Sequence, residues 1–164
     1  MGVLTDYFRA ADAAAVVRAL ERADERPLVG GRNPHFDGVE AKRLDPDLVL
    51  GELIAAIRQV PWEPGLVDER PVWPTTPEPG PDGPPDEDDP WATGPWVVEL
   101  DATVRDTLAG VRDVDVPTIV ASWVQAEELR PAGVEDMQPP AEELIRLARR
   151  AREAGEQLYC WICL

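Results

Sequence analysis

The sequence has very little of the residue types on which common catalytic sites depend. It contains one histidine and two cysteines, and Ser122 and Lys42 are its only serine and only lysine. A protein zinc site takes about four ligands, mostly Cys or His, and a hydrolytic triad needs a nucleophile matched to a histidine. His35 lies in a loop-like Asn-Pro-His-Phe-Asp segment with no nucleophile motif-linked to it. We therefore expect no catalytic residues, no metal site and no cofactor.

Long apolar runs are also missing. No stretch approaches the roughly 20 apolar residues that a membrane-spanning helix needs. The first ten residues include Asp6 and Arg9, so they do not resemble a signal peptide. Two cysteines cannot build a disulfide scaffold. These absences predict a cytoplasmic protein that does not associate with membranes.

Positive charge is scarce relative to negative charge. The chain has 32 acidic and 16 basic residues, a formal net charge of −16. Such a charge opposes binding to nucleic acid or to anionic membranes and favours a basic partner. Plain solubility is the simpler explanation and stays open. With 164 residues, 44% of them hydrophobic, the chain is expected to fold as a single domain over 1–164.

Hydrophobic periodicity and capping residues predict an α+β fold. We expect a small sheet that includes both chain termini, packed with about five helices. Asp12, Asp45-Pro46, Asp101 and Pro117 are helix-start signals, and Gly155 is a helix-end signal. The expected strands are 3–10, 39–44, 96–100 and 157–164, and the expected helices are 13–23, 45–60, 101–111, 117–129 and 139–155.

Residues 61–95 differ in kind from the rest of the chain. They hold 11 of the 18 prolines and nine acidic residues against one arginine. Such a composition does not favour a regular helix or sheet. Trp62, Trp73 and Trp91 lie within it, however, and tryptophan is rare in disordered segments. We expect a Pro-rich, acidic, irregular excursion that is attached to the domain at these tryptophans, with 82–89 exposed to solvent.

The final segment, QLYCWICL, is apolar on both alternating faces, which is typical of a central strand. It contains a C-x-x-C pattern at Cys160 and Cys163. Residues three apart on a strand point to opposite faces, so the two sulfurs would diverge and could not form a disulfide. Buried structural cysteines are the preferred interpretation, with redox and metal-binding roles as alternatives.

Five residues are candidates for a small-molecule site based on carboxylates: Asp6, Glu40, Lys42, Trp123 and Glu127. Glu127 follows Trp123 by four residues, which on one helix would place a carboxylate beside an indole and perturb its pKa. A capping role for Glu127 is the alternative. Glu40 and Lys42 alternate along an expected strand, where a local salt bridge is the simpler interpretation.

Two hypotheses about function follow. The first is a non-enzymatic binding or inhibitor-type protein with a basic protein partner, for which Trp73 and Trp91 among acidic residues would be interface anchors. The second is a small-molecule-binding domain or an enzyme that uses the carboxylates named above. These residues would have to converge on one concave pocket.

Several segments resemble a family of small actinobacterial proteins. The resemblance is carried in order by MGVLTDYF, VEAKRLDP, LGEL, GPWVVELDATVRDTLA, SWVQAEEL and LYCWICL, which cover about half the chain. More remotely, the Met-Gly start, the Tyr-Phe pair and the closing helix and strand resemble the YfbM-like family, although its long Trp-His region is missing here. Both resemblances imply a compact single domain and supply no catalytic residues.

Overall fold

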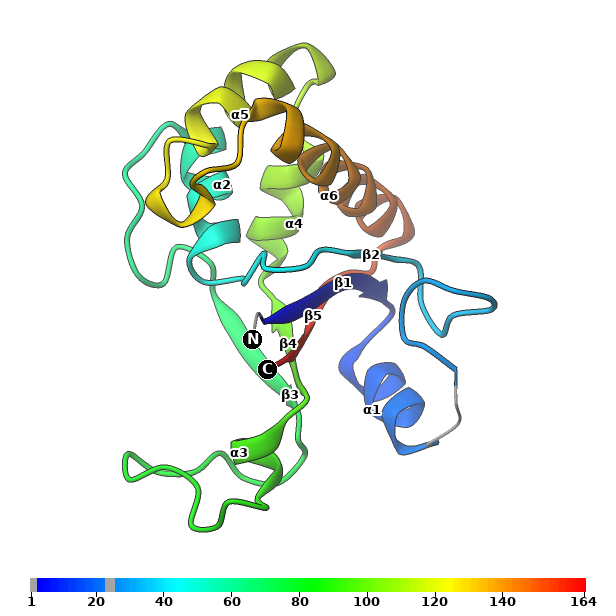
Figure 1. The fold of residues 1–164 in the computed structure, drawn as a ribbon. Helices are drawn as coiled ribbons and strands as arrows, with labels where there is room; N and C mark the ends of the chain where they lie inside the picture. The colour runs from blue at the N-terminus through cyan, green and yellow to red at the C-terminus, as the bar shows by residue number, and fades with distance from the viewer. Residues whose placement is uncertain (1–2, 23–25) are drawn as a thin grey trace.

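A five-stranded antiparallel sheet forms the centre of the protein. The computed structural model describes residues 3–22 and 26–164, and the strand order is β2-β1-β5-β4-β3 (Figure 1). The expected α+β class is confirmed, as is a sheet that includes the first and last strands of the chain, and the structure places these two strands side by side. The strands are β1 (Leu4–Ala10), β2 (Gly38–Glu40), β3 (Glu69–Trp73), β4 (Trp96–Leu100) and β5 (Gln157–Cys163).

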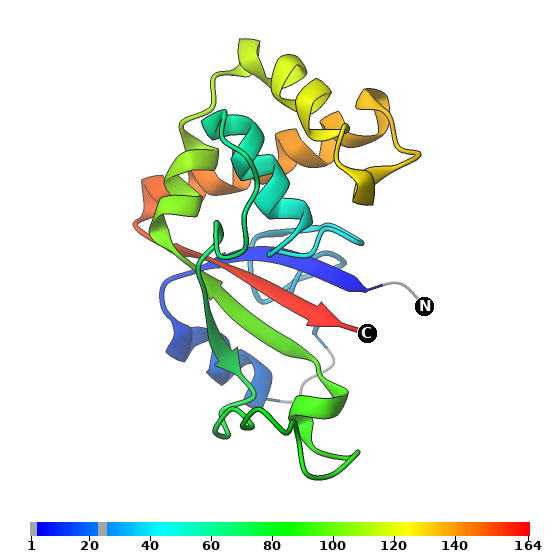
Figure 2. The same cartoon turned by 90° about the vertical axis from the view of Figure 1, so that its left-hand side faces the viewer.

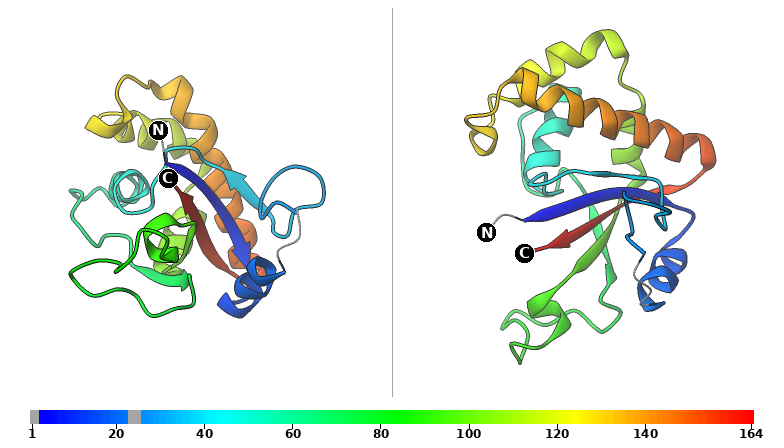
Figure 3. Two further views of the ribbon diagram at one scale, coloured as in Figure 1. Left: turned by 60° about the horizontal axis from the view of Figure 1, so that its bottom comes forward. Right: turned by 45° about the vertical axis from the view of Figure 1, so that its right-hand side comes forward.

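Helices cover both faces of this sheet. Within the described ranges there are six α-helices and two short 3-10 helices: α1 (Ala13–Glu21), α2 (Val49–Arg58), α3 (Pro90–Thr93), α4 (Ala102–Ala109), η1 (Asp113–Asp115), α5 (Val116–Trp123), η2 (Glu127–Leu129) and α6 (Val134–Ala154). Figures 2 and 3 show α2, α4, α5 and α6 on one face, which we call the upper face, and α1 on the lower face. None of the helices described is both long and apolar enough to cross a membrane.

The sheet separates two hydrophobic cores. The upper core is the larger and includes Tyr7 and Leu158 from the sheet together with Trp123 from α5. The lower core is built around Phe8 and Tyr159, whose rings stack with centroids 5.6 Å apart. β5 contributes to both, because its alternating side chains are apolar on both faces, as the sequence indicated.

Several helix starts are where the sequence placed them. The Asp12 carboxylate accepts a hydrogen bond from the backbone N–H of Ala15, and Asp101 caps α4 in the same way. The expected end of the first helix, Ala23, lies outside the described residues. The start at Asp45 needs a correction. Its carboxylate accepts from the Leu48 N–H and holds a turn, so that α2 itself begins at Val49.

The boundaries of α5 and α6 also differ from the expectation. The helix that opens near Pro117 ends at Trp123 instead of continuing to Leu129. α6 begins at Val134, five residues before the expected start, so Pro139 and Pro140 lie inside it. Two prolines remove two backbone donors from this helix. Its buried side, on which seven residues face the upper core, favours the helix strongly enough to offset that loss.

The segment 61–95 is less irregular than its composition suggested, because it contains β3 and the short α3. β3 tolerates Pro71 because it is an edge strand, paired only with β4. The Asp101 N–H donates to the Asp68 carbonyl. Along an antiparallel ladder, hydrogen-bonded residue pairs alternate with pairs that are not hydrogen-bonded. Because Asp68 is in a hydrogen-bonded pair, Pro71, three residues later, is in a pair that is not, and its missing N–H would face away from β4. That β3 is an edge strand, and that Pro71 is at a position which needs no N–H, could be recognised only in the folded chain.

Residues 74–95 form a projecting segment that we call the acidic arm. It leaves the sheet after β3 and returns at β4, below the body of the molecule in Figure 1. The Trp91 indole N–H donates to the carbonyl and the hydroxyl of Thr76, at 3.2 and 3.0 Å, and the Trp96 indole donates to the Trp91 carbonyl. Trp91 therefore closes the arm upon itself, whereas the sequence predicted that it attaches the segment to the domain.

Candidate functional site

Asp6, Glu40 and Lys42 come together at one edge of the sheet. Asp6 and Glu40 are register partners in the β1–β2 pair, so their side chains lie on the same face, directly opposite each other. Burial raises the pKa of Asp6 to about 6, and the Glu40 charge adds to the rise while Lys42 opposes it. A half-buried carboxyl with this pKa can exchange a proton near neutral pH.

The expected salt bridge between Glu40 and Lys42 is not present in the part of the chain that the structure describes. β2 ends at Glu40, and Lys42 belongs to the turn that follows, so the two residues do not alternate along one strand. The Glu40 carboxylate lies against Gly30, where a Cβ atom would meet its Cδ at 3.1 Å. Both charges act on Asp6, but they do not form an ion pair with each other.

Trp123 and Glu127 do not join this group. Trp123 is 1% exposed, and its indole N–H donates to the Val49 carbonyl at 2.9 Å, so it is a core residue that ties α5 to α2. Glu127 is exposed on η2, beyond the end of α5, and the expected carboxylate–indole pair on one helix is wrong. The chain turns after Trp123 and no longer follows helical spacing.

Trp73 and Trp91 lie at the opposite edge of the sheet from β2. Trp73 packs against the lower core at the end of β3, and Trp91 lies in α3, at the base of the acidic arm. Both are partly exposed. The five small-molecule candidates and the two interface candidates thus belong to separate regions of the molecule.

A second perturbed carboxyl, Glu69, was not identified from the sequence. Burial raises the pKa of Glu69 to about 7, and the charges of Asp47, Asp45 and Asp68 raise it further. These acidic residues come from the start of α2 and the start of β3, which are adjacent only in the folded chain. The run Asp68-Glu69 was visible in the sequence, but nothing local indicated its burial.

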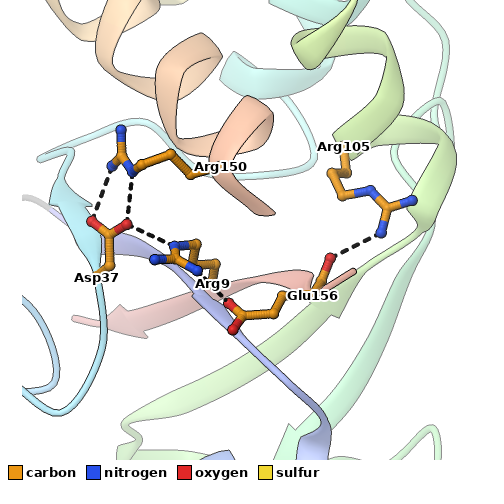
Figure 4. Close-up of polar contacts among 5 residues, drawn as sticks. All are labelled: Arg9, Asp37, Arg105, Arg150 and Glu156. Atoms are coloured by element: carbon orange, nitrogen blue, oxygen red, sulfur yellow. Dashed lines mark hydrogen bonds and ion pairs between the residues drawn. The ribbon is translucent and has the colours of Figure 1, made fainter. Parts of the chain in front are cut away.

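An ion-pair network holds the loop before β2 against the sheet and α6 (Figure 4). The Asp37 carboxylate accepts from the guanidinium groups of Arg150 and Arg9, each with a contact of 2.7 Å. Arg9 also pairs with the Glu156 carboxylate at 2.9 Å, and Arg105 donates to the Glu156 carbonyl. Hydrogen bonds from Arg150, supported by Arg9, lower the pKa of Asp37. These contacts fix the position from which Gly38 to Glu40 enter the sheet.

The two cysteines lie on opposite faces of β5, as the strand geometry predicted. Cys160 is buried in the upper core, Cys163 is partly exposed, and both are free thiols. Burial raises the pKa of the Cys160 thiol well above its usual value, which makes this thiol a poor nucleophile. Among the described residues, no group of three or more His, Cys, Asp or Glu side chains is arranged to hold a metal ion.

Comparisons with known proteins add no relative to this description. No protein-family model matches the chain, and no curated protein and no solved structure matches it either.

Proposed function

We propose that this protein is a non-enzymatic binding protein that engages a basic protein partner through its acidic arm. The observation that carries the proposal is the position of the arm, which extends from the body of the fold (Figure 1). Charge displayed on a projecting segment is accessible to a partner without any rearrangement of the core.

The composition of the arm supports a cationic partner. Between residues 74 and 95 there are six acidic residues and no basic one. Asp89 caps α3 by accepting the Trp91 N–H at 2.8 Å, and the other five are exposed. Exposed charges of one sign steer the encounter with an oppositely charged surface and make it sensitive to salt.

The base of the arm supplies apolar contact area next to this charge. The partly exposed indoles of Trp91 and Trp96 are held by hydrogen bonds to Thr76 and to the Trp91 carbonyl. Aromatic side chains in fixed positions are frequent anchors of interfaces. The arm therefore combines a charged tip with an aromatic base.

The test compares two matched triple variants in affinity capture at low and high salt. D86N/E87Q/D88N removes three of the six acidic charges of the arm, and E21Q/E63Q/E153Q removes three exposed acidic charges elsewhere. At low salt, we expect the wild type and the control variant to retain a basic partner, which mass spectrometry identifies. High salt should release this partner from both. The arm variant should fail to retain the partner even at low salt. Equal capture by both variants, or no basic partner at low salt, would contradict the proposal.

The alternative, an enzyme or small-molecule domain built on the five candidate residues, receives less support. Asp6, Glu40 and Lys42 lie near one another, whereas Trp123 serves the core and Glu127 lies beyond the end of α5. Glu40 and Lys42 do, however, line a cavity whose other walls the sequence did not indicate.

A further inference from the structure

A cavity of about 360 Å³ lies between the turn after β2, the segment after η2 and the N-terminal half of α6. We infer that this cavity is a binding site for a small organic monocarboxylate that carries an apolar group. The inference is independent of the acidic arm, because the cavity adjoins β2 and the arm adjoins β3, at opposite edges of the sheet. Its volume falls within the range of ligand pockets, about 300–1,000 Å³.

Three cationic side chains gather around this cavity: Lys42, Arg43 and Arg130. All three are exposed, and none of them makes an ion pair with another described residue. In the same description seven arginines do make such pairs: Arg9, Arg70, Arg105, Arg112, Arg146, Arg149 and Arg150. Lys42 interacts electrostatically with Asp6, but among the described residues no carboxylate lies within ion-pair distance of any of these three cations, so their hydrogen-bond donors are available to a ligand.

The backbone beneath one of these cations is in an uncommon conformation. Arg43 has a φ of 68°, in the left-handed region that non-glycine residues seldom adopt. A hydrogen bond from its N–H to the Val3 carbonyl holds it there. Such conformations cost free energy and are concentrated at sites with a function.

The walls between the cations are apolar. Leu44, Leu129 and Met137 are buried with their side chains at the cavity, and Ala132 and Pro140 add partly buried surface. This wall can accept a hydrocarbon or an aromatic group, whose burial contributes about 25 cal/mol per Å². A ligand with an anionic end and an apolar end would match both parts of the lining.

The acidic residues at the cavity limit the charge of the ligand. Glu40 lies against Gly30, and one oxygen of Asp136 accepts the Gly133 N–H at 2.9 Å. Glu128 is the third carboxylate in the lining. A dianionic phosphate would be repelled by these groups more strongly than a carboxylate, which carries a single charge. Guanidinium groups also bind carboxylates through paired hydrogen bonds.

The test uses hexanoate as the probe and follows backbone amide signals by NMR. We expect saturable shifts confined to residues 41–44 and 129–137. Hexylamine and hexanamide, which have the same chain without the negative charge, should give none, and hexyl phosphate should bind more weakly than hexanoate. The double variant R43Q/R130Q should weaken hexanoate binding by about tenfold or more, because it removes charged hydrogen bonds.

The control variant R18Q/R32Q removes two exposed arginines that line none of the described cavities, and it should bind hexanoate as the wild type does. Melting temperatures of both variants check that the fold is retained. Unsaturable or scattered shifts, equal binding of hexylamine, or full affinity in R43Q/R130Q would overturn the inference. Because neither variant alters the arm, capture of a protein partner should be unaffected, so this test and that of the proposed function can fail separately.

Discussion

Asp6 and Glu69 are the two carboxyl groups at which folding opposes ionisation most clearly. Asp6 faces Glu40 across the β1–β2 pair, and Glu69 is surrounded by the acidic residues at the start of α2. In both cases burial is the first cause of the raised pKa, and neighbouring carboxylates add to it. Each ionised carboxylate therefore lowers the stability of the folded state.

This arrangement predicts that the protein becomes more stable on mild acidification. A carboxyl whose folded pKa exceeds its unfolded value binds protons more tightly when folded, so the free energy of unfolding rises as pH falls through the folded pKa. With folded values of about 7 for Glu69 and about 6 for Asp6, the rise should extend from about pH 7.5 to about pH 4.5. Asp37, whose pKa is lowered, loses its contribution only below its ordinary value of 3.8.

Thermal unfolding measured between about pH 5 and 7.5 checks this prediction. After allowance for solvent screening, Glu69 should account for about 1 kcal/mol, or ~2–4 °C in melting temperature. Glu69→Gln should reduce the change of melting temperature with pH and raise the melting temperature at pH 7.5. Asp6→Asn should have the same two effects to a smaller extent. Asp86→Asn, on the exposed arm, is the matched control. A wild-type melting temperature that falls between pH 7.5 and pH 5 would contradict the assignment.

Among the elements, β5 makes the largest contribution to the fold. It is the middle strand, paired with β1 over seven residues and with β4 over four. Leu158 and Cys160 enter the upper core while Tyr159 enters the lower one, and all three are 2% exposed or less. Removal of this strand would separate β1 from β4 and open both cores.

Deletion of residues 157–164 should therefore abolish folding. Each large apolar side chain that is buried contributes on the order of 1.5–3 kcal/mol, against a total stability of roughly 5–15 kcal/mol. Circular dichroism and a thermal scan give the measurement. Removal of Leu164 alone is the control, because this side chain is 68% exposed and lies beyond the end of β5 at Cys163. A truncated protein with an unchanged melting transition would show that β5 is dispensable.

At the scale of the whole molecule, the acidic arm lies between β3 and β4 in the chain, and strands from both sides of the arm belong to the same sheet. A cut within 82–89 would leave β1, β2 and β3 in one fragment and β4 and β5 in the other. In the sheet order these strands are interleaved, so the β1–β5 and β3–β4 pairs would each join the two fragments. Backbone continuity through the arm is not needed to hold the sheet together.

Limited proteolysis with an enzyme that cuts after acidic residues should thus cleave first between Asp82 and Asp89. The acidic residues there are mostly exposed, and outside short turns the backbone has no regular structure. We expect two fragments on a denaturing gel but a single species in native size-exclusion chromatography. Early cleavage in α2, which is largely buried, or immediate separation of the fragments would contradict this organisation.

Much of the fold could be predicted from the sequence because it depends on local physics. Asp12 and Asp101 cap helices through their own nearby amides, and Gly155 ends α6 in the left-handed conformation that its missing Cβ allows. The two-sided apolar pattern of 157–164 likewise indicated a central strand. The sequence by itself determined these elements, since each signal acts within a few residues of its position.

Tertiary structure decided the rest. Pro71 could join a strand only because that strand lies at an edge of the sheet, and Pro139 could remain in a helix only because the buried side of α6 favours it. Glu69 acquired its raised pKa, and Lys42 came to share a cavity with Arg130, through contacts between segments far apart in the chain. Burial and electrostatic interaction depend on distance in space, and no local pattern in the sequence records that distance.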